Sequence, residues 1–129
     1  MTRILAKTNW AGWLMASFAT VMLLLPVTLK AADKPTAAEL TEAVSDHTYQ
    51  GSMSAANSGF AEYYAPDGAI RADGYTGKWR VEDGLMCFQY GDKPERCFGV
   101  ELHGPSMTMF KDGEIDGNGM LIPGNPSKF

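Results

Sequence analysis

The chain has 129 residues, two cysteines and a formal net charge of −4 at neutral pH. This length suits one small domain. The few Lys and Arg residues are scattered rather than gathered into a patch, which argues against a nucleic-acid partner or an anionic membrane surface.

The first thirty residues carry the pattern of an export signal. Arg3 and Lys7 precede an apolar run that contains Pro26, and small residues follow at Ala31 and Ala32. This pattern predicts a signal peptide over residues 1–31 and a single β-rich domain over 32–129, located in the periplasm or secreted. The alternative is an uncleaved membrane anchor, because residues 8–29 form an uncharged stretch long enough to span a bilayer.

Removal of residues 1–31 would leave an acidic domain with no stable membrane insertion. The remaining domain would contain eight Lys and Arg and all 15 Asp and Glu, which gives a net charge of −7. Export also allows disulfide formation, so we expect Cys87 and Cys97 to pair.

One short helix is predicted near the start of this domain, over about Thr36–Ser45. Thr36 and Glu39 have the spacing of a capping box. Leu40, Ala43 and Val44 follow at helical spacing and would pack against another element.

Turn signals divide the rest of the chain at the spacing of short strands. This spacing predicts an antiparallel meander of about seven strands, mainly β in class, curled into a lipocalin-like barrel or half-barrel. The turn signals lie at 57–59, 66–68, 73–74, 83–84, 91–94, 103–105, 111–113 and 116–119.

The Asp83-Gly84 turn predicts the register of the central hairpins. A two-residue turn places Trp79 opposite Phe88 and gathers the large apolar side chains on one face. The next hairpin then places Cys87 opposite Cys97 on the outer surface, close enough to bond.

We interpret this cysteine pair as a structural disulfide. A redox-active pair usually lies two residues apart at a helix N-terminus, and a zinc site needs about four ligands. A bond that closes this ten-residue loop would stabilise the fold by roughly 2–3 kcal/mol.

The residue types in two segments suggest candidate metal sites, one for copper and one for calcium. His103, Met107 and Met109 have the side chains that hold copper in an exported protein. The alternative is that both methionines fill the core while His103 points outward. Asp112–Gly119 resembles the start of a calcium loop, but Pro123 occupies the position of the bidentate Glu, so we interpret this segment as a pair of turns.

Aromatic residues are dense in the predicted domain, and most must form its core. In a small barrel the same inward side chains can line a cavity for an apolar ligand. The candidate ligand-binding residues are Tyr64, Trp79, Phe88 and Tyr90.

No pattern typical of catalysis is present in the sequence. It contains no Gly-x-Ser-x-Gly elbow, and no glycine-rich turn leads into a helix. We therefore expect a non-enzymatic protein without a cofactor, whose partner is a protein or a small apolar ligand in the cell envelope.

Several short motifs resemble a family of small secreted proteins from Gram-negative bacteria, a domain family of unknown function. They are Tyr64-Ala-Pro-Asp-Gly68, Gly77-x-Trp79-x-Val81, Asp83-Gly84-x-x-Cys87, Cys97, Asp112-Gly113 and Gly124-Asn-Pro126. The resemblance implies an exported all-β module with a disulfide and no catalytic residues.

A weaker resemblance links Gly77-x-Trp79 and Cys87 to small periplasmic β-barrel inhibitors of secreted metalloproteases. Cys97 lies closer to Cys87 than the second cysteine of those proteins does. This resemblance makes an inhibitor of an exported hydrolase one alternative function. The candidate copper residues His103, Met107 and Met109 make a periplasmic copper-handling protein the other.

Overall fold

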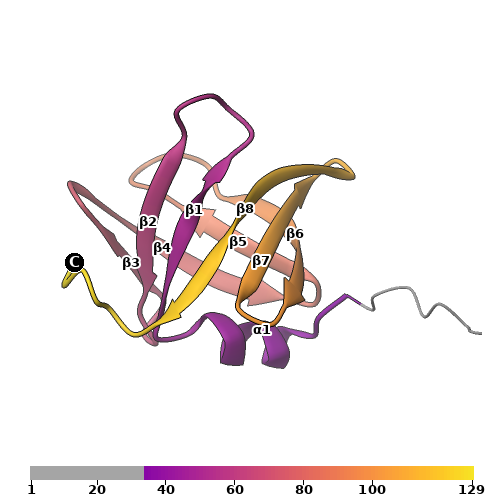
Figure 1. Ribbon diagram of the computed structural model, residues 1–129, viewed down its shortest axis with the longest axis horizontal. Coiled ribbons are helices and arrows are strands. Elements are labelled where there is room, and N and C mark those ends of the chain that lie inside the picture. The colour runs from indigo at the N-terminus through magenta and orange to yellow at the C-terminus, as the bar shows by residue number, and fades with distance from the viewer. Residues whose placement is uncertain (1–33) are drawn as a thin grey trace, which may run out of the picture.

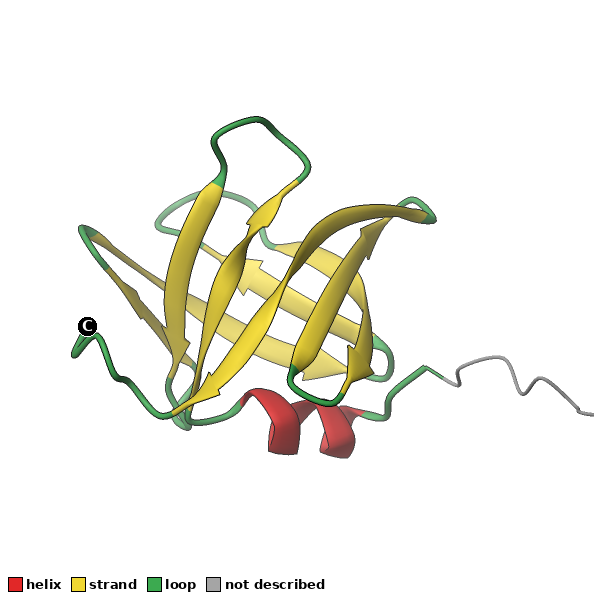
Figure 2. Ribbon diagram, viewed as in Figure 1, coloured by secondary structure: helices red, strands yellow, loops and turns green. Residues whose placement is uncertain are grey.

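The computed structural model describes residues 34–129. The signal peptide predicted over residues 1–31 lies outside the described residues. Within residues 34–129, one helix and eight strands follow one another (Figures 1 and 2). They are α1 (Ala37–Val44), β1 (His47–Met53), β2 (Gly59–Tyr64), β3 (Ala69–Ala72), β4 (Tyr75–Glu82), β5 (Leu85–Gln89), β6 (Arg96–His103), β7 (Ser106–Lys111) and β8 (Glu114–Pro123).

The eight strands form a closed antiparallel barrel in which each strand pairs with its neighbours in sequence. Closure comes from the pairing of β1 with β8, where Thr48 lies opposite Ile122 and Ser52 opposite Asn118. The predicted class, mainly β with an antiparallel meander, is confirmed, and the sheet closes fully. The barrel has eight strands where about seven were expected.

The predicted turn at 116–119 is wrong, because these residues lie inside β8. The glycines at 117 and 119 instead leave room for large side chains of β1. A Cβ on Gly119 would lie 2.6 Å from the ring of Tyr49, and one on Gly117 would lie 2.8 Å from the sulfur of Met53. Glycine here leaves room for bulky side chains of β1 against the backbone of the neighbouring strand β8.

Helix α1 lies across one end of the barrel (Figure 1). The predicted capping box is present: the Thr36 side chain accepts from the amide of Glu39, whose carboxylate accepts from the Thr36 amide. Leu40 and Val44 are fully buried and close this end. The Asp83 carboxylate accepts from the amide of Ala37 at 2.9 Å, which ties the helix to the β4–β5 turn.

The hairpin registers match the prediction. Trp79 lies opposite Phe88 and Met86 opposite Phe98, and the large side chains of both pairs are buried inside the barrel. Because neighbouring strands alternate in direction, the loops divide into two groups. Loops 65–68, 83–84 and 104–105 lie at the capped end beside α1, whereas loops 54–58, 73–74, 90–95 and 112–113 surround the other, open end.

Pairing between β2 and β3 is the shortest in the barrel. Tyr63 and Tyr64 of β2 pair with Arg71 and Ile70 of β3. The part of β2 nearer the open end, Gly59–Glu62, has no partner on the β3 side in this register. The hydroxyl of Tyr75 in β4 bonds to Glu62 across this gap.

Candidate ligand-binding site

A cavity of about 500 Å³ occupies the open end of the barrel, opposite α1. Its walls come from strands on all sides of the barrel and from the β5–β6 loop. The lining residues are Met53, Phe60, Glu62, Tyr64, Tyr75, Phe88, Tyr90, Lys93, Pro94, Arg96, Phe98 and Met109. Most are apolar or aromatic, which is the usual lining of a small-molecule site.

The one carboxylate in this lining belongs to Glu62, whose residue is only 3% exposed. Three tyrosine hydroxyls surround it. The hydroxyls of Tyr75 and Tyr90 lie 2.9 and 2.8 Å from Oε1, and those of Tyr64 and Tyr90 lie 3.1 and 3.0 Å from Oε2. Each carboxylate oxygen is therefore close to two hydroxyl groups, and the three hydroxyls together can donate three hydrogen bonds to the carboxylate.

Burial disturbs the ionisation of this cluster. It raises the pKa of Glu62 above its ordinary value, and the hydrogen bonds from Tyr90, Tyr75 and Tyr64 act in the opposite direction. Burial, reinforced by the charge of Glu62, also raises the pKa of each of these three tyrosines. All three hydroxyls therefore keep their protons at neutral pH and act as donors.

Positive side chains stand at the rim of the cavity. Lys93 and Arg96 both line it and both are exposed. The guanidinium of Arg96 lies 5.5 Å from the centre of the Phe98 ring, and the Lys111 ammonium lies 5.8 Å from the same ring. Among the described residues, neither Lys93 nor Arg96 takes part in an ion pair.

The structure brings together three of the four candidate ligand-binding residues. Tyr64, Phe88 and Tyr90 line the cavity, with ring centres 6.0 Å apart for Tyr64 and Phe88 and 6.5 Å for Phe88 and Tyr90. Trp79 does not line it. Its indole donates to the carbonyl of Ala65 at 2.9 Å near the capped end, where it packs on Tyr64.

Sequence reasoning assigned no role to Glu62, the central polar residue of the cavity. A signal was present, because Phe60, Glu62 and Tyr64 alternate along one strand and so point to the same face. A glutamate at an inward position of a strand is unusual enough to suggest a special role. Of its tyrosine partners, Tyr64 lies on β2 itself, whereas Tyr75 begins β4 and Tyr90 follows β5. Sequence spacing alone does not place β4 or the end of β5 beside Glu62.

The candidate copper residues do not form one ligand set. Met107 and Met109 are buried inside the barrel, where Leu102 faces Met107. His103 is the next residue along β6 and points to the other face, where its side chain is 67% exposed and lies 3.8 Å from Glu101. The methionines therefore serve as core residues, and Met109 also lines the cavity.

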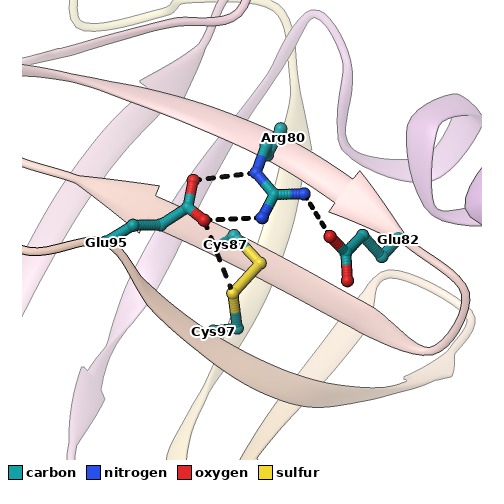
Figure 3. The surroundings of a disulfide bond; sticks show 5 residues. All are labelled: Arg80, Glu82, Cys87, Glu95 and Cys97. Carbon is teal, nitrogen blue, oxygen red and sulfur yellow. Dashed lines mark hydrogen bonds and ion pairs between the residues drawn. A yellow bond between two sulfur atoms is a disulfide. The ribbon is translucent and has the colours of Figure 1, made fainter.

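Cys87 and Cys97 form the predicted disulfide and lie directly opposite one another in β5 and β6. The prediction that both lie on the outer surface needs correction, because Cys87 is fully buried. Figure 3 shows the guanidinium of Arg80 beside the disulfide, bound to Glu95 and Glu82. Arg80 is the β4 neighbour of Cys87, so its long side chain lies over the same outward face.

This disulfide belongs to the one potential metal cluster among residues 34–129, which consists of Cys87, Glu95 and Cys97. Both sulfurs are committed to the disulfide, and the Glu95 carboxylate binds Arg80 at 2.6 and 2.8 Å. Cysteine binds a metal through its thiolate, and the disulfide leaves no thiolate at this position.

Within the described residues, no helix has the length and apolar character needed to cross a membrane.

No protein-family model matches this chain, and neither a curated protein nor a solved structure matches it significantly. The resemblance to small secreted Gram-negative proteins therefore stays a prediction from short motifs.

Proposed function

We propose that this chain is an exported, non-enzymatic binding protein that holds a small, largely apolar ligand in the open end of its barrel. The observation that carries the proposal is the cavity of about 500 Å³, walled by aromatic and methionine side chains around one buried polar cluster. A barrel of eight strands can hold one small ligand in this way. The disulfide fits an oxidising compartment such as the periplasm.

Ligand binding can be tested with a neutral apolar probe. Protein recovered from the periplasm of bacteria that express the full chain would be titrated with decanol by calorimetry. Trp79, the sole tryptophan after residue 31, gives a second signal, because its ring centre lies 6.0 Å from that of the cavity residue Tyr64. We expect saturable binding of one decanol and a change in tryptophan emission.

A matched pair of substitutions places the binding in the cavity. Met53 lines the cavity, whereas Ile115 is 63% exposed and does not. We expect Met53→Trp to fill the cavity and abolish decanol binding, and Ile115→Trp to leave it intact. Equal binding by both variants, or no binding by the unaltered protein, would contradict the proposal.

The same preparation tests export. Native mass spectrometry should show a chain that has lost residues 1–31 and the two thiol hydrogens of Cys87 and Cys97. A periplasmic protein that retains the first 31 residues would instead support the membrane-anchor alternative.

A further inference from the structure

Glu62 is a buried carboxylate that faces the cavity without a cation beside it. Among residues 34–129, no Lys, Arg or His nitrogen lies within ion-pair distance of its oxygens. Removing a carboxylate from water is costly unless a positive charge or a metal compensates it. The tyrosine hydroxyls are neutral and compensate only in part, so an ionised Glu62 places an unbalanced negative charge in the cavity.

Aromatic rings surround that charge. Phe60, Tyr64, Tyr75, Phe88 and Tyr90 all line the cavity together with Glu62. Tyr75 and Tyr90 meet edge to face at 5.9 Å, and Phe88 and Tyr90 stack at 6.5 Å. The faces of such rings attract cations, especially cations that are poorly hydrated.

The hydrogen bonds around Glu62 restrict which cation fits. Both carboxylate oxygens already lie within 3.1 Å of two tyrosine hydroxyls. The three hydroxyls have three hydrogens to donate, and a carboxylate has about four lone-pair sites, so about one site remains for the three N–H groups of a primary ammonium. A quaternary ammonium has no N–H group to satisfy and interacts through charge and methyl contacts alone.

The rim favours a second, negative group on the same ligand. A ligand with only a positive charge would be repelled by Lys93 and Arg96 as it entered the cavity. A ligand with an acidic group at its outer end would instead pair with these two side chains once its ammonium is inside. Both charges of such a ligand would be compensated.

We propose that the cavity ligand carries a trimethylammonium group, held by Glu62 and the surrounding aromatic rings, and an acidic group held at the rim by Lys93 and Arg96. This inference rests on the proposed function and names the chemical class of its ligand. Free phosphocholine and the head group of phosphatidylcholine share this chemistry.

The test compares ligands of one shape and different charge. Calorimetric titrations would use choline, its neutral tert-butyl isostere and phosphocholine. We expect choline to bind at least about tenfold more tightly than the isostere, a difference of about 1.4 kcal/mol, because a desolvated cation is attracted to the face of an aromatic ring. Phosphocholine should bind more tightly than choline. This comparison requires no variant, so it remains decisive even if a cavity substitution prevents folding.

Variants then assign each charge to its residue. Glu62→Gln should remove the preference for choline over the isostere, while the exposed Glu114→Gln should keep it. Lys93→Ala with Arg96→Ala should reduce phosphocholine affinity to that of choline. Because choline has a permanent charge, its binding should weaken as pH falls and Glu62 gains a proton, whereas binding of the isostere should stay constant.

Vesicles of phosphatidylcholine separate the two sources of the ligand. Co-sedimentation with them would assign the site to a lipid head group, and binding of free phosphocholine alone would assign it to a solute. If decanol binds in the cavity but choline binds no better than its isostere, this inference is wrong and the proposed function stands. If decanol also fails to bind, both are wrong.

Discussion

The hydroxyl of Tyr90 lies 2.8 and 3.0 Å from the two carboxylate oxygens of Glu62, so one tyrosine bridges both ends of a buried acid. Tyr64 and Tyr75 each bond to one of these oxygens. The cluster joins β2, β4 and the start of the β5–β6 loop inside the open end of the barrel. The stability of the barrel therefore depends on whether Glu62 is ionised.

The stability of the protein should depend on pH through Glu62. Burial raises its folded pKa above the ordinary 4.5, so the folded chain holds the proton more tightly than the unfolded chain does. The contribution of Glu62 to the free energy of unfolding is therefore largest below pH 4.5, falls as pH rises through the folded pKa, and is constant above it. Urea denaturation at several pH values should show this downward slope.

A variant isolates this effect from that of other acids. Glu39 and Glu95 have lowered pKa values, through hydrogen bonds to Thr36 and Arg80, and so contribute a slope of the opposite sign. The difference in stability between the unaltered protein and Glu62→Gln should carry the slope of Glu62 alone. An identical pH profile for the two proteins would contradict the assignment.

High pH should unfold the barrel through its inward tyrosines. Burial raises the pKa of Tyr49 from 10.0 to about 12, and those of Tyr64, Tyr75 and Tyr90 also rise. The folded state thus retains protons that the unfolded state loses, and stability should fall as pH rises above 10. Tyrosinate absorbance should increase together with loss of the β signal in circular dichroism, in one cooperative step. Smooth titration of all tyrosines near pH 10 in a folded chain would contradict this prediction.

Tyr49 and Tyr90 should respond in opposite ways to loss of the hydroxyl. The Tyr49 hydroxyl is buried and has no hydrogen-bond partner in the described part of the chain, so Tyr49→Phe should stabilise the protein by about 1 kcal/mol. Tyr90→Phe removes a donor from a buried carboxylate and should destabilise it by about 1–3 kcal/mol. Chemical denaturation of both variants at neutral pH measures this contrast. Equal destabilisation would indicate that Tyr49 has a partner, such as a buried water.

Gly119 should tolerate no side chain. A Cβ there would lie 2.6 Å from the carbonyl oxygen of Gln50 and from a ring carbon of Tyr49. Gly119→Ala must therefore separate β1 from β8, where the barrel closes, at an expected cost of about 1–3 kcal/mol. Gly59→Ala is the matched control, because a Cβ at Gly59 would meet its nearest neighbour at 3.8 Å. Similar melting temperatures for the two variants would contradict this account.

The disulfide should contribute to stability and leave the ligand site unchanged. It closes a loop between residues ten apart, and neither cysteine lines the cavity. Replacing both with alanine should lower the free energy of unfolding by roughly 2–3 kcal/mol. Decanol affinity should stay within about twofold when measured below the melting temperature. A large loss of affinity in the folded variant would show that the disulfide shapes the cavity.

Local pattern was enough to predict the hairpins and the helix of this protein. The Asp83-Gly84 turn and the alternation around it set Trp79 against Phe88 and Cys87 against Cys97. These features depend on residues near one another in the chain, where the strand period and the turn geometry leave one favourable register. The capping box of Thr36 and Glu39 follows for the same reason.

The candidate site was decided by contacts between distant parts of the chain. Glycine at 117 and 119 has the sequence pattern of a turn, yet these residues lie in a strand, where the absence of side chains leaves room for Tyr49 and Met53 of the neighbouring strand β1. The pairing of β1 with β8 closes the sheet. Tyr64 is already close to Glu62 along β2, but Tyr75 and Tyr90 reach Glu62 only through the tertiary fold. Sequence alone thus determined most of the strands and the face on which each of their side chains lies. The tertiary structure decided which inward residues meet, because alternation along a strand specifies the direction of a side chain and not its neighbour.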